Sequence, residues 1–302
     1  MVRRPVSTAR QIQELVMNTI TTKTTSLARQ VLQALLDEVT LTPKPGLVDL
    51  RSRGAHQDLN WALMCHSACA LQPVFQAMAD AGAAIDDDDA LRQRIGAIGR
   101  DGEAVMMAAT GGVNTHRGAI WALGLLATAA AQLDARGDSL APQAVAARAG
   151  ALARLTDRGA PGATGNKGEL ACRQYRVGGA RGQARAGFPL VLDAGLPALR
   201  AARARGDNET TARLNALLAI VASLDDTCVL SRGGVDALLV VQAGAATVLA
   251  AGGAGTRAGT RALLALEAAM LELNVSPGGA ADLLAATLFL DSLEEGEQHG
   301  KA

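Results

Sequence analysis

Polar residues gather in five segments that interrupt otherwise apolar stretches of the chain. The segments span residues 38–58, 110–118, 164–188, 225–234 and 276–282. Each combines glycine with charged side chains, and loops on a rigid scaffold are where catalytic and binding residues concentrate. A single segment of this kind is often only a capped turn. Five together favour a functional site.

The first segment is rich in side chains that bind cations and anions. It carries Glu38, Lys44, Asp49, His56 and Asp58. Carboxylates are the ligands that Mg²⁺ prefers, and a lysine binds phosphate as a point charge. A solvated loop with a capping aspartate is the alternative.

The second segment, from Thr110 to Gly118, is rich in glycine and opens a helix. Glycines let backbone N–H groups approach a phosphate, and a helix start adds positive potential. The segment lacks the Gly-Lys-Ser/Thr ending of a Walker A loop, which excludes that interpretation. His116 is a candidate proton donor, although a lone histidine is more often structural.

The third segment is basic. Its cations are Lys167, Arg173, Arg176, Arg181 and Arg185. A guanidinium group binds two oxygens at once, so such a cluster suits a polyphosphate. A solvated loop is again the alternative.

The last two segments combine acidic residues with helix starts. Asp225 and Asp226 are adjacent and could share a divalent cation, while Arg232 could hold a phosphate. The alternative is a helix end followed by a cap. In the fifth segment, Ser276 to Gly279 is a helix start that could receive an anion, although capping alone explains these residues.

The stretches between the polar segments show helical periodicity. Leu27, Val31 and Leu35 lie on one helical stripe, and Pro43 with Pro45 ends it. Asp86 to Asp89 predicts another helix start with Asp89 as its N-cap, and Asn114 or Thr115 is the expected cap of a later helix. Helices are predicted from residue 26, over 59–81, 117–133, 143–156, 189–204, 208–223, 235–250 and 259–273, and from 276 to 293. Residues 157–187 are predicted to form a long loop.

Composition supports an all-α fold. Aromatic residues make up only 2% of the 302 residues and apolar residues 49%, so close packing of helices through small side chains is favoured over a β-sandwich or barrel. Lysine plus arginine equals aspartate plus glutamate at 29 each, which disfavours a general nucleic-acid binder. We expect one compact multi-helix domain over 23–293 whose glycine-rich loops form the site. Residues 1–22 are expected to be a flexible leader and 294–302 a flexible tail.

The sequence also bears on location. Four cysteines fit a reducing cytosol, and Arg3 and Arg4 have no apolar stretch behind them that would make a secretory signal. The longest uncharged run, 237–256, contains Gln242 and glycines and is interpreted as a buried helix and loop, not a membrane span. We therefore expect a cytoplasmic protein that binds neither membrane nor nucleic acid.

The five segments resemble those of a known family. The strings are EVTLTPKPGLVDLRSRGAHQD at 38–58, ATGGVNTHRG at 109–118, GARGQARAGFP at 179–189, DDTCVLSRGG at 225–234 and SPGGAADLL at 276–284. Together they look like triphosphoribosyl-dephospho-CoA synthase, over about residues 26 to 293. The pattern is closer to the malonate decarboxylase branch than to the citrate lyase branch.

This resemblance implies an all-helical transferase. The family joins ATP to 3′-dephospho-CoA and releases adenine, giving 2′-(5″-triphosphoribosyl)-3′-dephospho-CoA. That product is the precursor of an acyl carrier protein's prosthetic group, and a separate transferase attaches it to the carrier. The expected partners are therefore ATP, 3′-dephospho-CoA and, through the product, a carrier-protein transferase. A homodimer is an open option.

The reaction suggests roles for the residues of the five segments. A hydroxyl must lose a proton, adenine must leave, and positive charge develops on the ribose. The expected catalytic residues are Asp49, Asp58 and His116. The expected substrate and phosphate contacts are Lys44, Asn114, Arg117, Arg181, Arg232 and Gly278. Mg²⁺ is the expected cofactor, with Asp225, Asp226 and Glu38 as its ligands.

Two positions depart from the family pattern, and two other functions remain open. Gln183 stands where a glutamate is usual, and Cys228 where an asparagine is usual. We therefore assign no base to position 183. One alternative is a nucleotide N-glycosidase that gives the sugar to water. The other is a non-catalytic helical partner of the carrier protein, which would not need clustered Asp, His and Arg.

Overall fold

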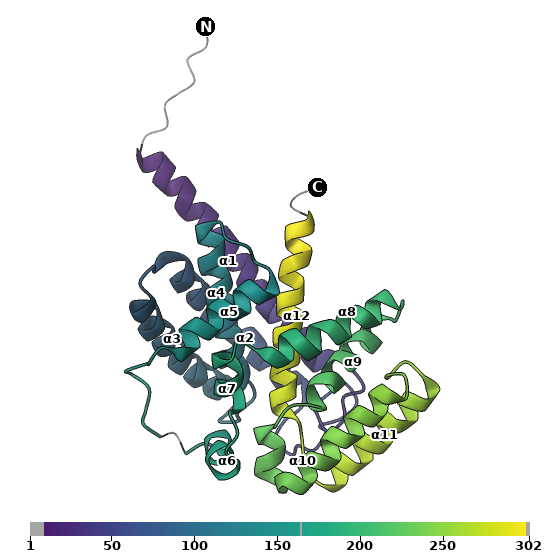
Figure 1. The fold of residues 1–302 in the computed structure, drawn as a ribbon. Coiled ribbons are helices and arrows are strands. Elements are labelled where there is room, and N and C mark those ends of the chain that lie inside the picture. The colour runs from purple at the N-terminus through teal and green to yellow at the C-terminus, as the bar shows by residue number, and fades with distance from the viewer. Residues whose placement is uncertain (1–8, 164, 300–302) are drawn as a thin grey trace.

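The computed structural model describes residues 9–163 and 165–299, and the regular elements in those ranges are all helical. The α-helices are α1 (Ala9–Thr40), α2 (Trp61–Ala84), α3 (Asp88–Ala109), α4 (Arg117–Arg136), α5 (Pro142–Arg154), α6 (Lys167–Tyr175), α7 (Gly179–Arg185), α8 (Leu196–Ala204), α9 (Glu209–Val221), α10 (Thr227–Ala250), α11 (Arg257–Glu272) and α12 (Gly278–His299). A π-helical turn, η1 (Val191–Gly195), precedes α8. The predicted all-α single domain is confirmed (Figure 1).

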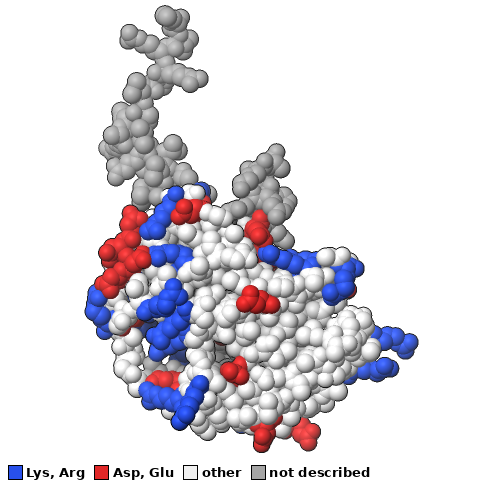
Figure 2. Space-filling model, in the orientation of Figure 1, with Lys and Arg blue, Asp and Glu red and all other residues white. Residues whose placement is uncertain are grey.

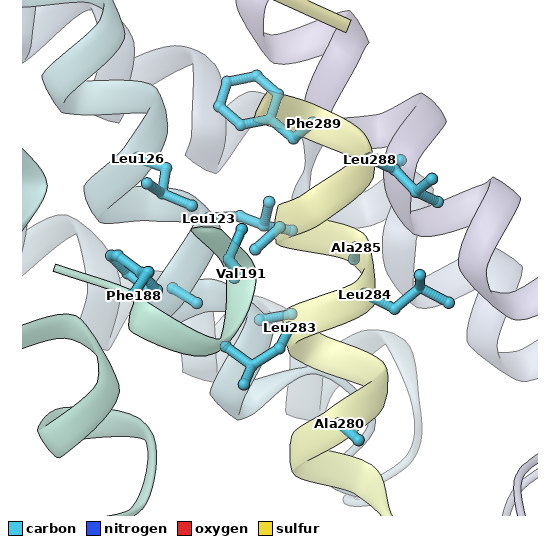
Figure 3. Packing of buried hydrophobic residues seen from close by; sticks show 14 of the residues in the cluster. Leu123, Leu126, Phe188, Val191, Ala280, Leu283, Leu284, Ala285, Leu288 and Phe289 are labelled. Atoms are coloured by element: carbon cyan, nitrogen blue, oxygen red, sulfur yellow. The ribbon is translucent and has the colours of Figure 1, made fainter. Parts of the chain in front are cut away.

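Helix α12 runs through the middle of the helical assembly (Figure 1). It contacts α1, α4, α9 and η1, among others. Figure 3 shows Leu284 and Phe289 of α12 in the same buried cluster as Leu123 of α4 and Phe188. The apolar residues of this helix therefore close the core.

Small residues allow the helices to approach closely, as the composition predicted. A Cβ at Gly82 of α2 would lie 2.3 Å from the carbonyl oxygen of Thr128 in α4. No side chain fits there, so the α2–α4 contact requires glycine. The Thr128 hydroxyl donates to Met78 O in α2 at 3.2 Å, which also joins the two helices.

Several helix starts differ from the predictions. The N-cap of α3 is Asp87, whose carboxylate accepts from Ala90 N, so the assignment of that role to Asp89 is wrong. Asp89 instead lies in the first turn, where its negative charge interacts favourably with the positive end of the helix dipole. Helix α4 has His116 at its N-cap position with no side-chain cap bond, in place of the expected Asn114 or Thr115.

Three regions predicted to be flexible or irregular contain helix. Helix α1 begins at Ala9, so residues 9–22 of the predicted flexible leader are helical and not irregular, while residues 1–8 lie outside the described part. Within the predicted loop 157–187, Asn166 caps the short helix α6, and α7 follows at Gly179. Helix α12 continues to His299 through most of the predicted tail, and residues 300–302 are not described.

Helices α4 and α10 are each long and apolar enough, by length and composition, to cross a membrane. In the fold α4 is mostly buried among other helices, whereas only 28% of the apolar window of α10 is buried. The expectation of a buried helix over 237–256 therefore holds for one side of α10 only. Gly234, at φ 70°, kinks this helix near its start.

Candidate active site

The loop between α1 and α2 is organised by Asp49. Its carboxylate accepts from the backbone N–H groups of Lys44 at 3.0 Å, Arg51 at 2.8 Å and Ser52 at 3.0 Å, and also from the Arg51 guanidinium. Burial opposes the charge on Asp49, but these hydrogen bonds outweigh it and lower the pKa of the carboxyl. Its oxygens are therefore engaged in holding the loop, although the sequence pointed to a place near the sugar.

Beneath this loop lies a buried ion pair. Lys44 is only 2% exposed, and its Nζ donates to the backbone oxygen of Glu38 at 2.6 Å and to Glu38 Oε1 at 2.5 Å. Glu38 is buried as well. The Lys44 ammonium group is thus paired with Glu38 in this structure. A phosphate contact by Lys44 stays a prediction.

The first turns of α10 and α12 are joined through Asp226. This residue caps α10 by accepting from Cys228 N at 2.8 Å, and its other oxygen accepts from Ala280 N of α12 at 2.9 Å. A Cβ at Gly279 would lie 3.1 Å from Asp226 Oδ2, and one at Gly278 would lie 3.0 Å from Cys228 Sγ. The two glycines, predicted as an anion-binding helix start, therefore allow the start of α12 to approach Asp226 and Cys228 of α10 closely.

Asp282 joins α12 to the first turn of α4. A Cβ at Gly118 would lie 1.9 Å from Asp282 Oδ2, so only glycine allows the contact. Burial, then the charges of Glu38 and Asp226, raise the pKa of Asp282 well above its usual range, although a hydrogen bond from Ala119 N opposes the shift. Asp282 is a member of the site that no sequence pattern indicated. Its signal was being the single charged residue of the fifth segment.

His116 lies at the same start of α4. It is 2% exposed, and its Nδ1 lies 2.9 Å from Ser67 Oγ, which in turn lies 2.6 Å from Thr115 Oγ1. Among the described residues, none forms a hydrogen bond with Nε2. Burial, then the charge of Lys44, lowers the pKa of His116 to about 4. It is therefore a neutral imidazole with one unoccupied nitrogen, and Ser67 is a partner that the sequence did not reveal.

A second histidine lies nearer the surface. His56 Nε2 lies 2.9 Å from Ser276 Oγ, and Nδ1 lies 3.1 Å from the Arg232 guanidinium, which also donates to Ala55 O at 2.8 Å. Exposed Asp58 is 3.8 Å from the same ring. Burial, then Arg232, lowers the pKa of His56 to about 4, while Asp58 opposes the shift. Segments one, four and five thus meet here.

The predicted metal ligands do not form one metal-binding group in the described part of the chain. Asp225 is exposed while Asp226 is buried, and Glu38 is paired with Lys44. No group of three or more His, Cys, Asp or Glu side chains that could hold a metal ion is found where the structure describes the chain. The three residues predicted as one ligand set therefore have different surroundings.

The predicted phosphate-binding arginines face solvent to different degrees. Arg117 Nε donates to Glu103 at 2.9 Å, and its backbone N–H donates to Asn114 Oδ1 at 3.3 Å. Arg181 on α7 is exposed. Helix α7 starts beside α10, because a Cβ at Gly179 would lie 3.3 Å from Thr227 Cγ2. Figure 2 shows basic side chains gathered on the side that carries α3, α5 and α7.

Comparison with known proteins gives a consistent result. The CitG family model, described as ATP:dephospho-CoA triphosphoribosyl transferase, matches residues 24–301. A protein of Azotobacter vinelandii named probable 2-(5″-triphosphoribosyl)-3′-dephosphocoenzyme-A synthase is 58% identical over 262 residues, covering 86% of this chain and 89% of the relative. A Klebsiella pneumoniae protein named as that synthase is 57% identical over 265 residues, covering 88% and 93%. No solved structure matches.

Proposed function

Since the chain belongs to the ATP:dephospho-CoA triphosphoribosyl transferase family, we propose that it joins ATP to 3′-dephospho-CoA and releases adenine. The family match rests on the sequence. The structural observation that carries the proposal is the meeting of three helix starts, those of α4, α10 and α12, where Asp282 also interacts with Glu38 of the Glu38–Lys44 pair. Positive helix ends and buried carboxylates at one place suit a phosphorylated sugar that gains positive charge as its base leaves.

His116 is suited to take the proton of the attacking hydroxyl. The 2′-oxygen of dephospho-CoA bonds to C1″ of the ATP ribose while the bond from C1″ to adenine breaks. A neutral imidazole with a pKa of about 4 and an unoccupied Nε2 can accept the hydroxyl proton. Ser67 on Nδ1 fixes the ring orientation. The buried carboxylates of Glu38 and Asp226 stabilise the developing charge on the sugar.

We propose that Mg²⁺ enters with ATP, bound to its triphosphate. The predicted ligands do not fit a resident ion. Lys44 forms an ion pair with the Glu38 carboxylate, and two backbone N–H groups donate to the Asp226 carboxylate. Mg²⁺ commonly keeps several waters and binds substrate phosphates with few protein ligands. Arg181, Arg117 and Arg232 are proposed to neutralise the remaining phosphate charge.

The pathway is also a proposal. We assign the product to the carrier protein of a malonate decarboxylase, on the closer resemblance of the polar segments to that branch; the citrate lyase branch is the alternative. A separate transferase would take the product onward, in the cytoplasm. Genes beside the one for this chain would decide between the two branches.

Mass spectrometry of the products tests the reaction. Incubated with ATP, Mg²⁺ and dephospho-CoA, the protein should release adenine and form a coupled product that retains all three ATP phosphates. Omitting dephospho-CoA should abolish adenine release. Equal release from ATP alone would identify the N-glycosidase instead, and no release under either condition would favour the non-catalytic partner.

A further inference from the structure

Asp282 is held in a constrained place that the roles assigned so far do not use. Its carboxyl lies against Gly118, where any side chain would collide with Oδ2, and Ala119 N donates to it. His116 lies two residues before Gly118, so Asp282 and His116 share the start of α4. Asp282 is partly accessible to solvent. It can therefore meet a substrate there.

Charged and titratable groups face Asp282 from every neighbouring element. They are Glu38 of α1 and Asp226 and Cys228 of α10, while Lys44 acts on His116 at the N-cap of α4. Glu38 is neutralised by Lys44, while Asp226 is stabilised by two backbone N–H groups. Asp282 has one backbone donor and no cationic partner among the described residues. Of the three carboxyl groups, it is the one most favoured to hold a proton.

We propose that Asp282 is the catalytic acid that protonates the leaving adenine, an inference that rests on the proposed transferase reaction. The Asp282 carboxyl gives its proton to a ring nitrogen of adenine as the bond from C1″ to N9 breaks, and the bonding electrons stay with the purine. Adenine leaves neutral and Asp282 becomes a carboxylate. The hydroxyl proton taken by His116 then returns to Asp282, so each turnover moves one proton from the 2′-hydroxyl to adenine.

The roles of Asp282 as acid and His116 as base agree with the directions of their pKa shifts. Burial and neighbouring charges push the pKa of Asp282 up and that of His116 down to about 4. A carboxyl favoured to hold its proton beside an imidazole that stays neutral supplies an acid and a base for one step. An acid of this kind acts in its protonated form, so activity should be present below the pKa of Asp282 and be lost as pH rises through it.

The test compares leaving groups. Asp282→Asn is assayed with ATP and with p-nitrophenyl β-D-ribofuranoside 5-triphosphate, each with dephospho-CoA. The p-nitrophenolate released from the second substrate departs as a stable anion. With ATP we expect a loss of about 100-fold or more. With the p-nitrophenyl substrate the variant should stay within about tenfold of the wild type. Asp236→Asn, on the exposed part of α10, is the matched control and should behave as wild type with both.

The outcomes separate this inference from the proposed reaction. A wild type that forms no coupled product overturns the proposed function itself. An active wild type whose Asp282→Asn variant loses equal activity with both substrates, or loses none with ATP, overturns the role of Asp282. If the variant does not fold, the wild type decides: its rate should fall at high pH with ATP and not with the p-nitrophenyl substrate. An identical alkaline fall with both would contradict the proposal.

Discussion

His116 and His56 share a pKa of about 4, yet they lie in regions built for different tasks. Around His56 both ring nitrogens have partners, Ser276 and Arg232, so the ring joins its loop to α10 and to the segment just before α12. At His116, Nδ1 has a partner, while none of the described residues forms a hydrogen bond with the buried Nε2. A lowered pKa alone therefore does not identify a proton acceptor. The free nitrogen distinguishes the two regions.

The largest expected effect separates the two histidines directly. His116→Gln should lower turnover by about 10²–10⁴-fold, because the amide cannot take the hydroxyl proton. His56→Gln should lower it far less, since an amide can still hydrogen bond to Ser276. Steady-state assays of both variants, with melting curves to check folding, measure the difference. Equal losses in the two variants would end the distinction drawn between them.

The buried ion pair of Glu38 and Lys44, whose charge acts on His116, should stabilise the fold. Lys44→Met leaves the Glu38 carboxylate buried without its cation, so the free energy of unfolding should fall by about 3–5 kcal/mol. Urea denaturation measures this. Lys44→Met combined with Glu38→Gln removes the stranded charge and should recover much of the loss. A double variant no more stable than the single one would show that the pair acts independently.

The loop that carries His56 should depend on Asp49 and on pH. Asp49→Asn should cost about 1–3 kcal/mol, because one buried and two partly buried backbone N–H donors lose a charged acceptor. The pKa of Asp49 is lowered, so its contribution is present above the ordinary carboxyl pKa and is lost as pH falls through the lowered value. Denaturation at neutral and strongly acidic pH should show the variant's deficit shrinking in acid. Asp58→Asn, at an exposed carboxylate, is the control.

The smallest expected effect concerns the charge beside His56. Arg232→Met removes a cation that lowers the pKa of His56, so this pKa should rise from about 4 toward the ordinary 6.5. Burial, the larger cause, remains and should keep the rise partial. An NMR titration of the imidazole protons follows both histidines at once. His116 serves as the internal reference, and a parallel shift there would show that Arg232 acts on both regions.

The sequence predicted the helices well because apolar spacing and breakers such as Pro43 and Pro45 are local signals. It misjudged residues 157–187, where Asn166 supplies a cap for α6 amid glycines and charges that also suit a loop. The segments with His56, His116 and Asp226 were identified from residue types. Ser67 and Asp282 were missed because their importance comes from contacts with distant residues, His116 and Gly118. Such contacts have no local pattern.

The central place of α12 has a consequence for the growing chain. Translation produces Glu38 and His116 early, but Asp226 gains its bond to Ala280 only when the last of the described helices is made. Until then the start of α4 lacks Asp282, and the apolar surfaces of α1, α4 and α9 that contact α12 are uncovered. A nascent chain on the ribosome would thus have an incomplete site and an exposed hydrophobic core. Chaperones that bind exposed apolar helices could bind the chain in that interval, before α12 is synthesised and covers these surfaces.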